Sequence, residues 1–449
     1  MIMQKHLGRS AVIWGALMLA PLFVQAPAAR GAQQSQQPSY TMPEYNQFTN
    51  CQSEKDLTAK TKCLDAFVIA YPHSTLMQYV DEMYYQTYYQ LKNYAKCIEY
   101  ADKLVALDQA DIARRAQASQ VRVQLFPYAF NPKAPDAQKQ LTSERDAAAQ
   151  GVKILQAFKA TPNAKLTDAQ YKNLLALFYA SAGLADFQLK DNAAAIEAFK
   201  SALENNPADA VSEYRLGLAY LGTTPPQSLD GFWALARAIS LKVPDADKVK
   251  DFLRKSILSY EQPGCDSQVD PQLSELLQLA ANAPTRPSTY TIPSHDDLTK
   301  ISASSTIVSV LSDLSAGGDK AKMTWLAVCG AEFPQVVGKI IDVQKTDTTA
   351  DFMVFTSASA DEMQAATTAN MDVKVWIAPP PAGATTAQVT PQPNVVRLQK
   401  EDEIRFSGTI TSYDPSPFLL HWDQVTVDPS IIPEKSAPGK RAPHRIPSK

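Results

Sequence analysis

Two stretches of the chain repeat one helix-pair pattern at a fixed spacing, and this spacing constrains the fold more than any other feature. Residues 179–207 are typical of a helix, a short turn and a second helix that ends at Pro207, and residues 213–241 restate the first half. Gly183 and Gly217 are separated by 34 residues. An apolar stripe this rich in alanine is too thin for a helix that stands alone, so the pattern predicts helix pairs that stack on one another.

The first of these units resembles a tetratricopeptide repeat (TPR). The positions that carry the resemblance are an aromatic residue, a small residue, three residues along the second helix and a closing proline: Tyr179, Gly183, Ala195, Phe199, Ala202 and Pro207. The next unit keeps Leu216, Gly217 and Tyr220, then departs through the longer turn "TTPPQSLD", with its proline displaced to Pro244. A third unit, at 78–108, fits more loosely.

The resemblance implies an α-solenoid over residues 48–285 that binds a peptide or protein on its concave face, without a cofactor. First-helix residues that it directs inward are the candidate binding residues, and the alternative role for each is packing between repeats. They are Tyr89, Leu184, Phe187, Tyr214, Leu218 and Leu221.

The N-terminus has the pattern of an export signal. Residues 1–32 combine a basic start, an apolar run too short for a membrane span, and small residues suited to cleavage. The alternative is an uncleaved anchor. No later stretch is long and apolar enough to cross a bilayer, so we expect an exported protein, either periplasmic (or of the cell envelope) or secreted. Residues 33–47, rich in Gln, Ser and Pro, are expected to be disordered.

The C-terminal part changes to a period of two residues, which predicts strands. The expected strands are 336–344, 351–358, 371–378, 403–413 and 418–427. Five short strands favour a small β-barrel over 333–428, preceded by a linker with short helices (286–332) and followed by a disordered basic tail (429–449). The stretch "LQKEDEIRFSGTITSYDPSPFLLHWDQVTV" resembles the last strands of OB-fold barrels of exported bacterial proteins; an SH3-like barrel is the competing topology. The fold class is therefore α followed by β.

The barrel raises a second possible function, the binding of glycan or cell wall. Trp376, Trp422 and His421 would form a stacking patch for a sugar or peptide if they lie on the surface, whereas the alternative places these aromatic residues in the barrel core and rim. Acidic residues outnumber basic ones in 336–428, which disfavours nucleic acid because phosphate backbones would be repelled.

No catalytic constellation emerges from the sequence. The chain has five histidines and a formal net charge of -3, and it lacks phosphate-binding glycine loops, HExxH and GxSxG. We therefore expect a non-catalytic scaffold, with no catalytic residue, no metal site and no cofactor.

The five cysteines are an odd number, so at least one is free or paired with another molecule. Cys63 and Cys97 lie in helical apolar stripes and are interpreted as core packing residues. Cys265 and Cys329 flank one region and are the candidate disulfide pair.

Overall fold

The computed structural model describes residues 40–162, 164–261, 266–379 and 390–434. It divides into two units, one made of the residues up to Leu253 together with Glu275–Ser288, the other of Arg254–Ser274 and the residues from Thr289 onward. The boundary falls inside two helices, α11 (Ala246–Glu261) and α12 (Asp266–Asn282). None of the helices in these described ranges is both long enough and apolar enough to cross a membrane.

The first unit is built from helices. Besides parts of α11 and α12 it contains α1 (Met42–Ser53), α2 (Leu57–Ala70), α3 (Met77–Gln90), α4 (Tyr94–Ala106), α5 (Ile112–Ala129), α6 (Ala137–Lys159), α7 (Asp168–Gln188), α8 (Asn192–Asn205), α9 (Ala210–Leu221) and α10 (Ser228–Ser240).

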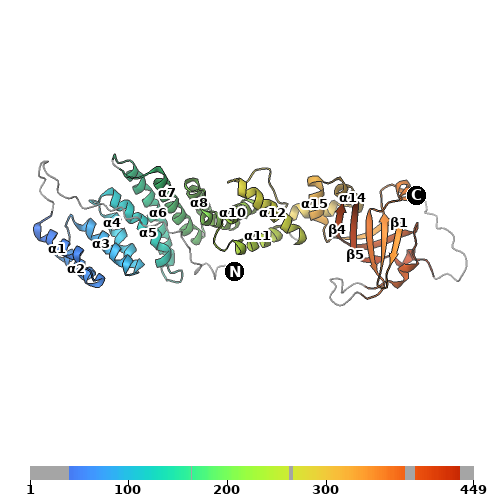
Figure 1. Ribbon diagram of the computed structural model, residues 1–449, viewed down its shortest axis with the longest axis horizontal. Helices are drawn as coiled ribbons and strands as arrows, with labels where there is room; N and C mark the ends of the chain where they lie inside the picture. Colours follow the sequence, from blue (N-terminus) through green and yellow to red (C-terminus); the bar gives the residue numbers. More distant parts are fainter. Residues whose placement is uncertain (1–39, 163, 262–265, 380–389, 435–449) are drawn as a thin grey trace. The chain divides into compact units, whose positions relative to one another are not determined.

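These helices pack in sequence order, as Figure 1 shows. From α1 to α10 each helix contacts the next, and the first helices of neighbouring pairs also contact one another: α3 with α5, α5 with α7, and α7 with α9. A helix that touches both its own partner and the next pair buries a continuous core without long-range connections. The prediction of stacked helix pairs is confirmed.

The two glycines of the 34-residue spacing lie where helices approach closely. A Cβ placed on Gly183 of α7 would lie 2.8 Å from ring atoms of Phe199 on α8, and one on Gly217 of α9 would lie 2.8 Å from Leu235 Cγ on α10. Phe199 and Leu235 are fully buried. The same close approach thus recurs in two consecutive pairs, which is the physical reason for a small residue at this position.

Short Leu-Lys-Asn/Asp turns join the helices of two pairs. Lys92 after α3 and Lys190 after α7 adopt positive φ angles of 56° and 65°. The next residue, Asn93 or Asp191, donates its N–H to the carbonyl oxygen five residues earlier, at 2.9 Å in both turns, which closes the C-terminus of the first helix. The side chain of the same residue caps the second helix. One residue therefore ends one helix and starts the next.

Two features of the N-terminal helices differ from expectation. α1 begins at Met42, inside the segment for which we expected disorder, and a capping box between Thr41 and Glu44 starts it. Cys63 forms a disulfide with Cys51, with a Cα–Cα distance of 5.4 Å, so its interpretation as a packing residue is wrong. Helical periodicity shows that Cys63 faces inward, but not that a second cysteine on α1 faces it.

Besides parts of α11 and α12, the second unit contains short helices and a closed β-barrel. The helices are α13 (His295–Ser304), α14 (Ile307–Ala316) and α15 (Gly318–Val328); the strands are β1 (Glu332–Lys345), β2 (Thr349–Phe355), β3 (Met371–Trp376), β4 (Glu403–Pro415) and β5 (Phe418–Val427), with α16 (Ala360–Ala365), η2 (Pro393–Arg397) and η3 (Pro429–Ile431) between or after them.

The strand order is β1-β2-β3-β5-β4, closing back onto β1. Neighbouring strands are antiparallel except β3 and β5, which are parallel. The parallel pair gives a Greek-key rather than a meander order, as expected for an OB-like barrel. The predicted sequence of helices followed by a small five-stranded barrel is therefore confirmed.

The barrel core extends into the preceding helices. Inward-facing strand residues such as Phe352, Phe406 and Trp422 form one cluster with Leu314 of α14 and Trp325 of α15. The Trp325 ring also packs edge-on against Tyr413 of β4, with centroids 5.0 Å apart. We infer that α14 and α15 belong to the barrel's folding unit rather than to a linker, because they share its core.

Candidate functional site

The candidate binding residues on α7 and α9 occupy matching positions. Each helix carries a stripe at i, i+3, i+7 and i+10, and the two stripes are offset by the 34-residue period. On α7 the stripe is Leu177, Ala180, Leu184 and Phe187; on α9 it is Val211, Tyr214, Leu218 and Leu221. All except the buried Ala180 are half-buried. Because α7 contacts α9, the structure brings five of the six predicted residues onto adjacent helices.

Two of these five residues also serve packing. Phe187 packs against the core cluster that contains Phe199 and Leu216. Leu221 lies against Gly231 of α10, where an added Cβ would be 2.8 Å from its side chain. Leu184, Tyr214 and Leu218 are the other three of the five, and each is half-buried.

A buried ion pair connects α9, the helix that carries the second stripe, to α10. Glu213 of α9 and Arg237 of α10 are 6% and 9% exposed, with Arg237 Nε 3.6 Å from Glu213 Oε1. Arg237 Nη1 also donates to the carbonyl oxygen of Ala280 on α12, at 3.1 Å. Burial raises the pKa of the Glu213 carboxyl to about 7, and the nearby Arg237 opposes the shift. These contacts join α9, α10 and α12.

The sixth predicted residue, Tyr89, lies elsewhere. It is on α3, which α5 separates from α7 in the order of packing, and it is 44% exposed. Its ring lies 6.3 Å from that of Tyr94, which lies 5.5 Å from that of Tyr128. Sequence reasoning missed Tyr94 and Tyr128, because three helices bring these rings together and no single helical period contains them.

The proposed aromatic patch on the barrel does not form. Trp422 is 2% exposed and packs edge-on against Phe406, with ring centroids 5.1 Å apart. Trp376 is 7% exposed, and Lys374 Nζ lies 4.9 Å from its ring centroid. Both tryptophans are thus packing residues, so the feature that favoured glycan binding is absent from the barrel surface.

His421, the third member of that expected patch, lies between two carboxylates. Its Nδ1 is 3.1 Å from Asp372 Oδ2 on β3, and its Nε2 is 3.1 Å from Asp414 Oδ2 on β4. The carboxylates contact opposite sides of the ring, so the three side chains do not converge on a common point. Among the residues described, no group of three or more His, Cys, Asp or Glu side chains is arranged to hold a metal ion.

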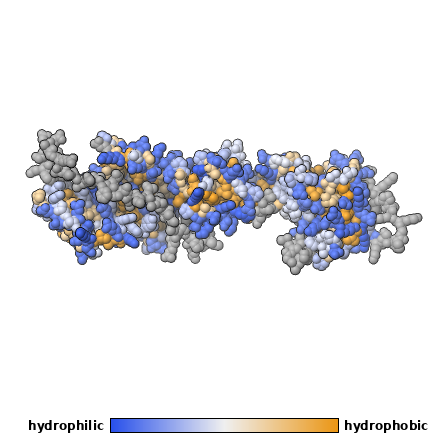
Figure 2. Space-filling view, in the orientation of Figure 1, coloured by the Kyte–Doolittle hydropathy of each residue, from blue (hydrophilic) through white to orange (hydrophobic). Residues whose placement is uncertain are grey.

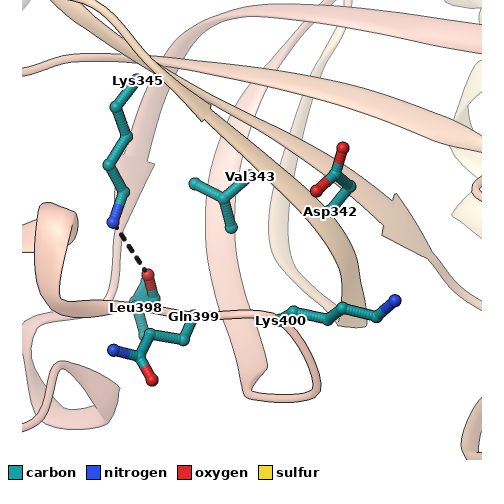
Figure 3. A pocket seen from close by; sticks show the side chains of 6 residues that line it. All are labelled: Asp342, Val343, Lys345, Leu398, Gln399 and Lys400. Atoms are coloured by element: carbon teal, nitrogen blue, oxygen red, sulfur yellow. Dashed lines mark hydrogen bonds between the residues drawn. The ribbon is translucent and has the colours of Figure 1, made fainter.

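One shallow pocket on the barrel, of about 310 Å³, has polar walls (Figure 3). Lys345 of β1 directs its ammonium to backbone carbonyl oxygens of Val396, at 2.6 Å, and Leu398, at 3.5 Å. The Lys400 side chain points away from Lys345. The cationic groups therefore do not converge, and the pocket offers no acid–base or anion-binding constellation.

The hydrophobic areas of the surface, like the candidate sites described above, are small and separate on the face that Figure 2 draws. On the face drawn in Figure 2, hydrophobic side chains form separate patches among hydrophilic ones, over the helices and over the barrel.

Cys97 is buried and free, as expected for a packing residue, and burial raises the pKa of its thiol to about 12. Cys265 lies outside the described residues, so its pairing with Cys329 stays a prediction.

No protein-family model matches this sequence, and a search of curated proteins finds no significant match.

Proposed function

We propose that this protein is an exported, non-catalytic scaffold of the periplasm or cell envelope, whose TPR-like helix pairs bind a peptide or another protein. The observation that carries the proposal is the matched pair of half-buried stripes on α7 and α9. Apolar residues at i, i+3, i+7 and i+10 on neighbouring helices are suited to anchor the side chains of a bound polypeptide.

The chemistry of the stripes favours a partner with apolar anchor residues. Leu184 and Leu218 present aliphatic surface, and Tyr214 adds an aromatic ring with a hydroxyl group. Aromatic residues of this kind contribute strongly to binding when a partner excludes water from them. The proposed site needs no cofactor.

Affinity capture from a cell-envelope extract with the full chain tests this function. We expect the double variant Leu184→Glu/Leu218→Glu to capture about tenfold less of a partner, or less still. The reason is that binding would have to desolvate two carboxylates. Ile69→Glu is the matched control, since Ile69 is an apolar residue on α2 that is already 82% exposed.

A partner that is retained equally by the wild type, the double variant and the control would contradict the proposal. Chemical crosslinks from the captured partner should map to α7 and α9. Crosslinks confined to the barrel would instead favour the glycan- or barrel-centred alternative.

A further inference from the structure

The barrel has an incomplete strand pairing at the beginning of β1. β4 accompanies β1 from Glu332 to Lys339, whereas β2 pairs with it only from Lys339 onward. β2 ends at Phe355, opposite Lys339, and the chain then leads into α16. Within the described part of the chain, residues 332–338 therefore have a partner strand along one edge only.

A pocket of about 430 Å³ lies along this open edge. Its walls include five consecutive β1 residues, 333–337, and Thr356 and Ser357, the two residues that follow β2. Successive side chains of a strand point to opposite faces, so five in a row can line one pocket only if it runs beside the backbone. The pocket thus occupies the place that an extension of β2 would fill.

Further lining residues lie on or next to two helices. Ile307, at the start of α14, and Met363 of α16 add apolar surface, while Thr306 adds a hydroxyl group. None of the residues that line the pocket carries a charged side chain. The volume falls in the range of roughly 300–1,000 Å³ that is usual for ligand sites.

The edge itself limits how much backbone pairing can occur. Pro334 has no N–H to donate, Gln335 adopts a φ of 52° within a β-bulge and donates its N–H to Ser407, and Val337 O already accepts the Thr356 hydroxyl. Proline and bulges at a sheet edge prevent long edge-to-edge pairing. A bound peptide segment would therefore make only a short stretch of backbone contact, and its affinity would depend on one of its own side chains entering the pocket.

We propose that this pocket binds a short extended peptide from another protein, anchored by one large, uncharged apolar side chain. Open sheet edges accept extended peptides through main-chain hydrogen bonds, and an adjoining pocket supplies specificity. The lack of charged lining residues disfavours acidic and basic anchors, because a charge that loses water without gaining a partner is unfavourable. This site is separate from the stripes on α7 and α9.

Blocked, fluorescein-labelled pentapeptides Ser-Thr-Xaa-Thr-Ser test the proposal on the full chain, with Xaa as Leu, Met or Phe. We expect at least one to bind, and replacement of its anchor by Ala or Asp to weaken binding by about tenfold or more. N-methylation beside the anchor should weaken binding about fivefold or more, because it removes a main-chain donor. If no peptide binds below about 1 mM, or if the Ala and Asp peptides bind as well, the proposal is wrong.

Variants and crosslinking locate the site. Met363→Glu should reduce affinity about tenfold or more, whereas Val396→Glu, at a 37% exposed apolar residue outside the pocket lining, should stay within about twofold. A peptide with a photoreactive leucine anchor should crosslink to residues 305–307, 333–337, 356–357 or 363. This result does not depend on the folding of a variant. Crosslinks at other positions would overturn the proposal while leaving the proposed function of the helix pairs untouched.

Discussion

Arg122 of α5 and Glu144 of α6 form an ion pair inside the helical unit, with only 4% and 1% of their side chains exposed. Arg122 also contacts Asp102 of α4, at 3.2 Å, and Glu144 accepts a hydrogen bond from Ser181 of α7. Four consecutive helices thus meet at one polar cluster. A buried pair of this kind constrains how helices align, because a slip in register would leave both charges unpaired.

Arg122→Met should lower the free energy of unfolding by about 3–5 kcal/mol, because it leaves Glu144 buried without its cation. The double variant Arg122→Met/Glu144→Gln should recover part of this loss. Urea unfolding followed by far-UV circular dichroism measures both effects. Lys96→Met is the control: its pair with Glu99 is 46% and 42% exposed, so we expect a loss below about 1 kcal/mol. Equal losses in the buried and exposed pairs would contradict this account.

Gly183→Ala should also destabilise the helical unit. The added methyl group would meet the buried ring of Phe199, at a cost of about 1–3 kcal/mol, which exceeds the gain of about 0.5–1 kcal/mol from replacing a helical glycine. Gly222→Ala is the control, because there the new methyl group meets only the end of the Asn192 side chain. A thermal midpoint for Gly183→Ala at or above that of the wild type would show that α8 can move away freely.

The Cys51–Cys63 disulfide should stabilise the first helices. It closes a loop with a sequence separation of 12, for which loop-entropy arguments predict roughly 2–4 kcal/mol. The double variant Cys51→Ala/Cys63→Ala should therefore unfold at a lower urea concentration. Dithiothreitol should shift the wild type toward the double variant and leave the variant itself unchanged. A wild type insensitive to this reductant under unfolding conditions would argue against the bond.

The stability of the helical unit should depend on pH through Glu213. Its pKa is raised from 4.5 to about 7 in the folded state, so folding favours the protonated form. The stabilisation from this group is complete below the unfolded pKa of 4.5 and is lost as the pH rises through about 7. The loss is about 3 kcal/mol.

Glu213→Gln should therefore flatten the dependence of the urea midpoint on pH between about pH 5 and about pH 8. Glu204→Gln, at an exposed residue of α8, should leave this dependence unchanged. Identical slopes for Glu213→Gln and the wild type would mean that Arg237 keeps the carboxyl charged in the folded protein.

Trp422→Ala should destabilise the barrel rather than remove a surface contact. Removal of this buried ring from between Phe333 and Phe406 should cost about 3–5 kcal/mol. Near-UV circular dichroism and thermal unfolding measure this loss, and Val396→Ala at the surface is the control. A barrel of unchanged stability would return Trp422 to the list of candidate ligand contacts.

Much of the fold follows from local sequence patterns. The expected strand 418–427 coincides with β5, and the expected strand 403–413 begins where β4 begins and ends two residues before it. Thr167 and Gln170, three residues apart in the sequence, form a capping box at the start of α7. These features depend on residues a few positions apart, so periodicity and capping rules suffice to predict them.

The candidate sites were less accessible to this reasoning. The stripes on α7 and α9 repeat with the 34-residue period and so were largely predictable. The tyrosine cluster of α3, α4 and α5 and the pocket beside β1 were not, because each combines elements whose contacts no local pattern specifies. The pocket exists because β2 ends at Phe355 while β1 extends further back along β4.

The amino-acid sequence by itself therefore determined the helix pairs, the change to strands and the side of each element that is buried. Tertiary structure alone decided that Cys63 meets Cys51, that Trp422 packs against Phe406, and that the start of β1 has one open edge. The physical reason is that periodicity records whether a side chain is buried, whereas its partner depends on the three-dimensional register of distant segments.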